Sequence, residues 1–79
     1  MKAQDRMLAL IGTFKDEQPI VREIATWLVA GGMYEYVDDE GEAYMDSLRN
    51  EWPEATDDDI TRGHNLAYAV AKTVKRGTN

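Results

Sequence analysis

The chain has 79 residues, of which 15 are acidic and 9 are basic, so its net charge at pH 7 is −6. A chain of this length is expected to form one small domain, residues 1–79, with a thin core. A thin core argues against a large internal active site. It favours association with a partner protein or, in a homodimer, with a second copy of the chain. The absence of cysteine excludes disulfides, thiolate catalysis, zinc fingers and iron–sulfur clusters, and it favours a cytoplasmic location.

Two helices are expected in the N-terminal part of the chain. Apolar residues recur at steps of three and four over residues 3–14, and Phe14 is the last of them. Pro19 opens a second helix over residues 19–30, because proline suits the first turn of a helix. Gly31 is expected to end this helix, since glycine tolerates the left-handed conformation.

The segment 33–45 has two interpretations. In the favoured one, Asp38 caps a helix over residues 39–51, whose first turn contains acids that the helix dipole stabilises. In the alternative, residues 33–37 and 42–45 form the strands of a short β-hairpin around a turn at residues 38–41, because Tyr and Val suit strands and Gly41 suits a turn. Pro53 ends the helix in the favoured interpretation.

A long last helix is expected over residues 57–76. Thr56 is a favourable N-cap, and Asp59 takes the reciprocal position of a capping box. The apolar stripe of this helix consists of Ile60, Gly63, Ala67, Val70, Ala71 and Val74. The small residues in this stripe are spaced by four, which would let another helix of the same chain approach closely.

These segments predict an all-α fold, a small bundle of three to four short helices. The expected core comprises Met7, Leu10, Ile11, Phe14, Ile20, Ile24, Trp27, Leu28, Met45, Leu48, Trp52, Ile60, Ala67, Val70 and Val74. No apolar run reaches the ~20 residues that a membrane span requires, so no membrane association is expected.

The sequence lacks the motifs of an enzyme or a metal site. A calcium loop centred on Gly41 would place Tyr36 first and Ser47 last, where oxygen ligands from acids are required. The chain's one serine, Ser47, has no nucleophile-elbow context, and no glycine-rich phosphate loop is present. We therefore expect no enzymatic activity, no cofactor and no metal site.

The negative charge is concentrated in the middle of the chain. Residues 33–59 contain eleven acids and one base, whereas residues 1–32 have no net charge and residues 60–79 contain four bases and no acid. Duplex binding depends on basic side chains that neutralise phosphates, so direct DNA binding is not expected. An acidic segment instead favours a protein partner with a basic surface.

Tyrosines alternate with acids at the start of this acidic segment. The candidate partner-binding residues are Tyr34, Glu35, Tyr36, Asp38, Asp39, Glu40, Glu42 and Asp46. Tyrosine is enriched at binding hot spots, and carboxylates complement a basic partner. The interpretation is a non-enzymatic inhibitor or adaptor, one version of which imitates nucleic acid and blocks a nucleic-acid-processing host complex. The simpler interpretation of the same residues is a solvated acidic face.

In size and acidity the chain is similar in character to the inhibitor proteins that phages and plasmids encode against host defences, although no motif supports the likeness. The alternative function is a small helical transcriptional regulator. A recognition helix must present its N-terminal residues to the major groove, and the acids at the expected helix starts would repel phosphate there.

Overall fold

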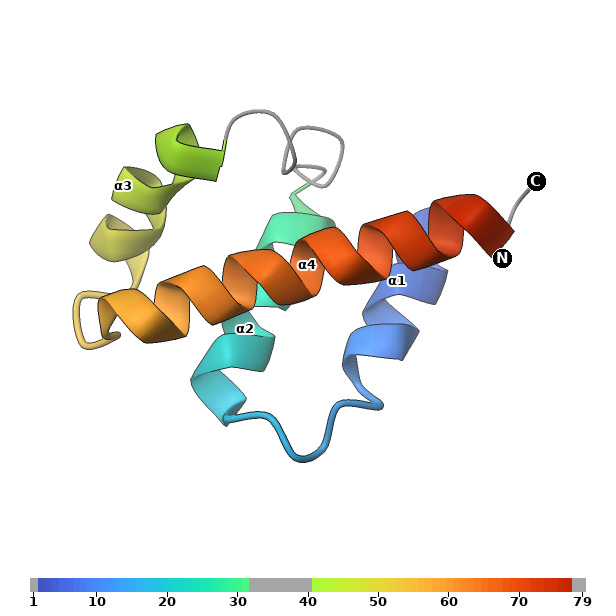
Figure 1. Cartoon of the computed structure of the whole chain (residues 1–79), viewed down its shortest axis with the longest axis horizontal. Coiled ribbons are helices and arrows are strands. Elements are labelled where there is room, and N and C mark those ends of the chain that lie inside the picture. The colour runs from blue at the N-terminus through green and yellow to red at the C-terminus, as the bar shows by residue number, and fades with distance from the viewer. Residues whose placement is uncertain (1, 32–40, 78–79) are drawn as a thin grey trace.

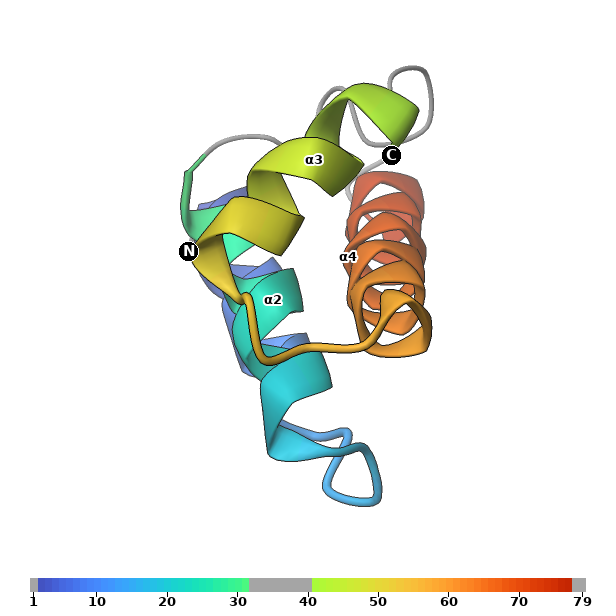
Figure 2. The same cartoon turned by 90° about the vertical axis from the view of Figure 1, so that its left-hand side faces the viewer.

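Four helices and no strand make up the part of the chain that the computed structural model describes, residues 2–31 and 41–77. They are α1 (Ala3–Ile11), α2 (Pro19–Ala30), α3 (Gly41–Glu51) and α4 (Asp57–Gly77). Helix α4 contacts each of the other three, and it lies across α1 and α2 with α3 near its beginning (Figure 1). The end view shows α2 and α4 side by side (Figure 2). The predicted all-α bundle is confirmed.

Helix α1 is shorter than predicted. It ends at Ile11 because the carbonyl of Leu10 accepts both the backbone N–H of Thr13, at 3.0 Å, and its hydroxyl, at 2.7 Å. The N–H of Phe14 donates to the carbonyl of Ile11 at 3.1 Å, which is again the spacing of a turn and not of an α-helix. The Phe14 side chain follows this turn and is 41% exposed, so its assignment to the core was wrong.

Helix α3 decides between the two interpretations of residues 33–45. Residues 42–45 lie within α3, so the hairpin, which needs a strand there, is wrong. The predicted helix is confirmed from Gly41 to Glu51, and residues 39 and 40 lie outside the described part of the chain. At the end of α3, the backbone N–H of Trp52 donates a hydrogen bond to the carbonyl of Leu48 at 2.9 Å, directly before Pro53.

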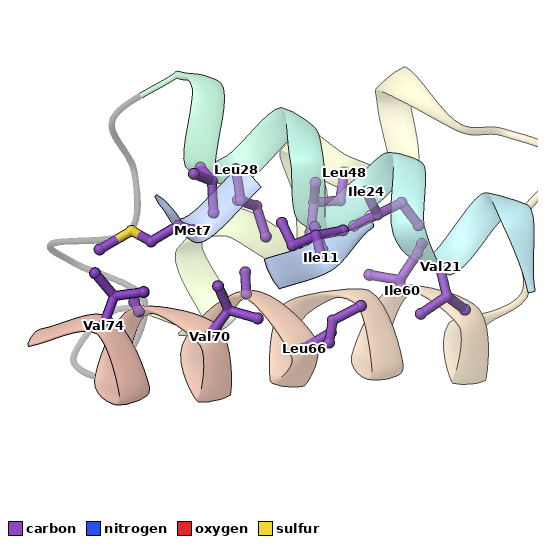
Figure 3. Close-up of a cluster of buried hydrophobic side chains, with 14 residues drawn as sticks. Met7, Ile11, Val21, Ile24, Leu28, Leu48, Ile60, Leu66, Val70 and Val74 are labelled. Carbon is purple, nitrogen blue, oxygen red and sulfur yellow. The ribbon is translucent and has the colours of Figure 1, made fainter. Parts of the chain in front are cut away.

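The core lies between α4 and the sides of α1 and α2 that face it (Figure 3). Val70 and Val74 on α4 point toward Met7, and Ile60 lies beside Val21. The buried hydrophobic residues are Met7, Ile11, Val21, Ile24, Ala25, Leu28, Val29, Leu48, Ile60, Leu66, Ala67, Val70, Ala71 and Val74. The predicted stripe of α4 is therefore buried as expected.

Four other residues assigned to the core lie at its edge. Leu10, Ile20, Trp27 and Trp52 are only partly buried and pack against the core from outside. On α2 the buried face is centred on Ala25 and Leu28, because α1 and α4 both pack against that side of the helix. The side chain of Met45 lies outside the described part of the structure.

Helices α2 and α4 approach closely at Gly63. A Cβ atom at Gly63 would lie 2.5 Å from Cγ2 of Ile24, 2.7 Å from Cβ of Ile24 and 3.2 Å from the carbonyl oxygen of Val21. Carbon atoms in favourable contact are about 3.5–4.0 Å apart, so no larger residue fits here without movement. The intramolecular role predicted for the small residues of α4 is thus confirmed at Gly63.

The start of α4 has the predicted capping box. The N–H of Asp59 donates to Oγ1 of Thr56 at 3.1 Å, and the N–H of Thr56 donates to Oδ2 of Asp59 at 3.2 Å. Two backbone donors that an isolated helix start would leave unpaired are thereby satisfied.

The end of α2 differs from the prediction. The helix stops at Ala30, but Gly31 has φ −79° and ψ 0°, which is not the left-handed conformation. The side-chain amide of Gln4 on α1 donates to the carbonyls of Val29, at 2.9 Å, and Ala30, at 3.0 Å. A side chain distant in sequence thus satisfies carbonyls at the end of α2.

Replacing Gly63 with alanine is expected to lower the free energy of unfolding by about 1–3 kcal/mol, because the new methyl group overpacks the contact with Ile24. Urea unfolding measures the effect. Gly12→Ala is the matched control, since a Cβ there would meet only backbone oxygens at 3.3 Å and 3.9 Å. A Gly63→Ala protein as stable as the parent would contradict the close approach of α2 and α4.

Thr56→Ala is expected to lower the free energy of unfolding by about 1 kcal/mol, because it removes the side-chain acceptor of the capping box. Thermal unfolding followed by circular dichroism is the measurement. The control is Thr61→Ala, an exposed position within the same helix, which should change stability by less than about 0.5 kcal/mol. Equal effects of the two substitutions would contradict a specific role for the cap.

Candidate functional site

Most of the predicted partner-binding surface lies outside the described residues. This holds for Tyr34, Glu35, Tyr36, Asp38, Asp39 and Glu40. Glu42 belongs to the first turn of α3, and Asp46 is exposed further along the same helix. The binding role of all eight residues stays a prediction, and the described part of the acidic segment begins with α3.

Arg49 pairs with two of the described acids. Its Nη1 lies 3.0 Å from Oδ1 of Asp46, and its Nε lies 3.1 Å from Oδ1 of Asp57. The hydrogen bond that Arg49 donates to Asp57, followed by the charge of that carboxylate, raises the pKa of Arg49. This arginine therefore connects α3 to the start of α4 and uses both carboxylates within the molecule.

The remaining acids at the start of α4 also have internal partners. Arg62 pairs with Glu17 from the connection before α2, and its Nη1 lies 3.9 Å from Oδ2 of Asp58. Asp59 belongs to the capping box. The three successive aspartates thus all have partners within the molecule around the beginning of α4.

Glu51 and Glu54 differ from these acids. Both are exposed, and neither has an ion pair or hydrogen bond from its side chain to another described residue. They stand on either side of Trp52 and Pro53 in the connection between α3 and α4. Two carboxylates without a partner among the described residues therefore flank Trp52 in the sequence.

Trp52 lines an open groove together with one face of α2. Its ring meets that of Trp27 edge to face, with centroids 5.7 Å apart and an angle of 90° between the planes. The groove has a volume of about 570 Å³ and is lined by Pro19, Arg22, Glu23, Thr26, Trp27 and Trp52. The lining residues of α2 recur at steps of three and four, so they share the helix face opposite the buried one. Figure 2 shows the connection from α3 passing beside α2 on its way to α4.

Arg22 is the polar group of the groove with an unmet hydrogen bond. The residue is partly buried, and its Nε is shielded from solvent without an acceptor among the described residues. No ion pair joins Arg22 to a described acid. A shielded donor without a partner costs about 1–3 kcal/mol, so an incoming acceptor would be favoured here.

The groove was not predicted from the sequence. Trp27 and Trp52 were predicted to belong to the core, although the polar residues Glu23 and Thr26 lie on the same face of α2 as Trp27. This mixture of polar residues with Trp27 was the sequence signal that could have indicated an exposed face. Trp52, which contacts Trp27 in the groove, comes from a distant segment of the chain. Helical spacing within one segment does not predict such a contact.

The chemistry of the groove suits binding. The indole rings offer apolar and π surface, Arg22 offers donors and Glu23 offers a carboxylate. Among the side chains that the structure describes, no group of three or more His, Asp or Glu is arranged to hold a metal ion. Within residues 2–31 and 41–77, no helix has the length and apolar character needed to cross a bilayer.

Comparison of the chain with known protein families, with curated proteins and with solved structures found no match.

Arg22→Lys is expected to raise the free energy of unfolding by about 1 kcal/mol, because lysine keeps the charge and removes the shielded Nε donor. Urea unfolding of the two proteins measures the change. Arg6→Lys on α1 is the control and should change stability by less than about 0.5 kcal/mol. A clear loss of stability in Arg22→Lys would show that the guanidinium stabilises the free protein.

Proposed function

We propose that this protein is a non-enzymatic binding protein, an inhibitor or adaptor, that occupies a basic surface of a partner protein. Its binding surface consists of Glu51 and Glu54 together with the groove lined by Trp27 and Trp52. The partner's cations would face the free carboxylates while its apolar groups cover the indole rings.

The observation that supports this proposal most strongly is the difference between paired and unpaired acids. Arg49, Arg62 and the capping box engage the carboxylates of Asp46, Asp57, Asp58 and Asp59. Glu51 and Glu54 make no such contact with the described residues, and they flank the groove residue Trp52. Acids that stabilise the fold are thus separated from acids that are available to a partner.

Charge and aromatic surface contribute differently to such an interface. Exposed carboxylates increase the rate of association with a basic protein, and salt screens this attraction over about 8 Å at 0.15 M. Tryptophan is among the residues most enriched at binding hot spots, where it slows dissociation.

The version of this function in which the acids imitate nucleic acid stays a prediction. The acids from Asp38 to Glu40 on which it partly depends lie outside the described residues. The aspartates from Asp57 to Asp59 have internal partners, which favours the broader proposal of a basic protein partner. The cytoplasmic location and the alternative of a transcriptional regulator are likewise predictions.

The double substitution Glu51→Gln and Glu54→Gln tests the proposal. Tagged parent and variant are used to capture proteins from a lysate of the source cells, and the captured proteins are identified by mass spectrometry. The parent should capture a basic protein from the lysate, and the double variant should capture less of that same protein. With that protein purified, the association rate constant should fall about threefold or more, because two attractive charges are lost.

Asp5→Asn with Asp16→Asn is the matched control. Both aspartates are exposed, neither pairs with a described residue, and the change in net charge is the same. The control should bind like the parent. If both double variants weakened binding equally, the partner would respond to net charge alone and the proposed surface would be wrong.

A further inference from the structure

We infer that the groove between Trp27 and Trp52 is an anchor site for a basic peptide segment of the partner, and that it holds one apolar side chain with lysine or arginine on both sides. This inference rests on the proposed function and specifies the chemistry of its partner.

The size and lining of the groove fit an apolar side chain. A volume of about 570 Å³ lies within the range of ligand-binding pockets, about 300–1,000 Å³. The two perpendicular indole rings and the ring of Pro19 offer apolar walls to an occupant. Both tryptophans are only partly buried in the free protein, so an occupant would remove further apolar area from water.

The shielded donor of Arg22 favours a peptide over a hydrocarbon ligand. The Nε of this residue has no acceptor among the described residues, and Arg22 is a lining residue of the groove. A rotation of the side chain toward the groove would let Nε donate to a main-chain carbonyl of the occupant. Every peptide segment has such a carbonyl beside its side chain, whereas an alkyl chain has none.

The charges around the groove favour a basic segment over an acidic one. Glu23 lines the groove, and Glu51 and Glu54 flank Trp52 in the sequence. Against these three carboxylates stands the single positive charge of Arg22. Lysine or arginine on either side of the apolar residue would therefore find a complementary charge, and like-charge repulsion would weaken an acidic segment.

The two tryptophans of the chain both line the groove, so intrinsic fluorescence reports on it specifically. The probe is the peptide acetyl-Lys-Lys-Leu-Lys-Lys-amide, titrated to about 1 mM, which corresponds to weak binding. Two comparison peptides replace the leucine with glycine or the four lysines with glutamate. The leucine peptide should change the emission saturably and bind about tenfold more tightly than the glycine peptide, because the leucine is buried in the groove against the two rings.

Two substitutions test whether binding takes place in the groove. Thr26→Tyr puts a bulky side chain on an exposed lining position, and Thr61→Tyr makes the same change at an exposed position of α4 outside the groove. Circular dichroism verifies that both proteins are folded. Thr26→Tyr should abolish the fluorescence response, Arg22→Lys should weaken peptide binding a few-fold, and Thr61→Tyr should bind like the parent.

The outcomes separate this inference from the proposed function. If the leucine and glycine peptides bound equally and Glu51→Gln with Glu54→Gln weakened both, charge recognition would stand and the anchor site would be overturned. Equal or tighter binding of the glutamate peptide, or no binding of the leucine peptide, would also overturn it. Sedimentation of the free protein tests one further alternative. If the parent were a dimer and Thr26→Tyr were a monomer, the groove would bind a second copy of the chain, and the basic-peptide inference would be overturned.

Discussion

The contact between Gly63 and Ile24 determines how the other elements are placed. Because glycine lets α4 lie directly against α2, the apolar stripe of α4 reaches the side chains of α1 and α2 and closes the core. The opposite face of α2 then remains outside the core. The short connection after α3 places Trp52 at the edge of that face, where it meets Trp27. The groove is thus a consequence of which side of α2 is buried.

The acidic segment serves two purposes in the described structure. Arginines on α3 and α4 pair with the aspartates near the start of α4, and the capping box uses another, so repulsion among these carboxylates is offset locally. Exposed pairs of this kind contribute little stability individually, and the pair of Arg49 with Asp57 joins α3 to the start of α4. Glu51 and Glu54 have no partner among the described residues, and in the sequence they stand on either side of the groove residue Trp52.

Local patterns predicted much of the fold, and contacts between distant segments limited the rest. Helical spacing, Pro19 and the sequence from Thr56 to Asp59 identify α2 and α4 because these signals act within a few residues. The turn bonds after Ile11, the capping of α2 by Gln4 and the meeting of Trp27 with Trp52 depend on tertiary packing. An amphipathic pattern shows that Trp27 is apolar, but not that its ring lines an open groove. For the same reason the unpaired state of Glu51 and Glu54 could not be predicted from the acidic composition.

Quenching of tryptophan fluorescence by caesium and by iodide tests the central claim without a partner. The claim is that Trp27 and Trp52 line an open groove and that the unpaired acids Glu51 and Glu54 act on its surroundings. With each ion normalised to its quenching of free N-acetyltryptophanamide, because iodide is the intrinsically stronger quencher, we expect caesium to quench the parent more strongly than iodide. Glu51→Gln with Glu54→Gln should narrow that difference, whereas Asp5→Asn with Asp16→Asn, which changes the net charge equally, should leave it largely unchanged. Weak quenching by both ions would contradict the claim, since the tryptophans would then be inaccessible. An equal effect of the two double variants would also contradict it, since the quenching would then respond to net charge alone.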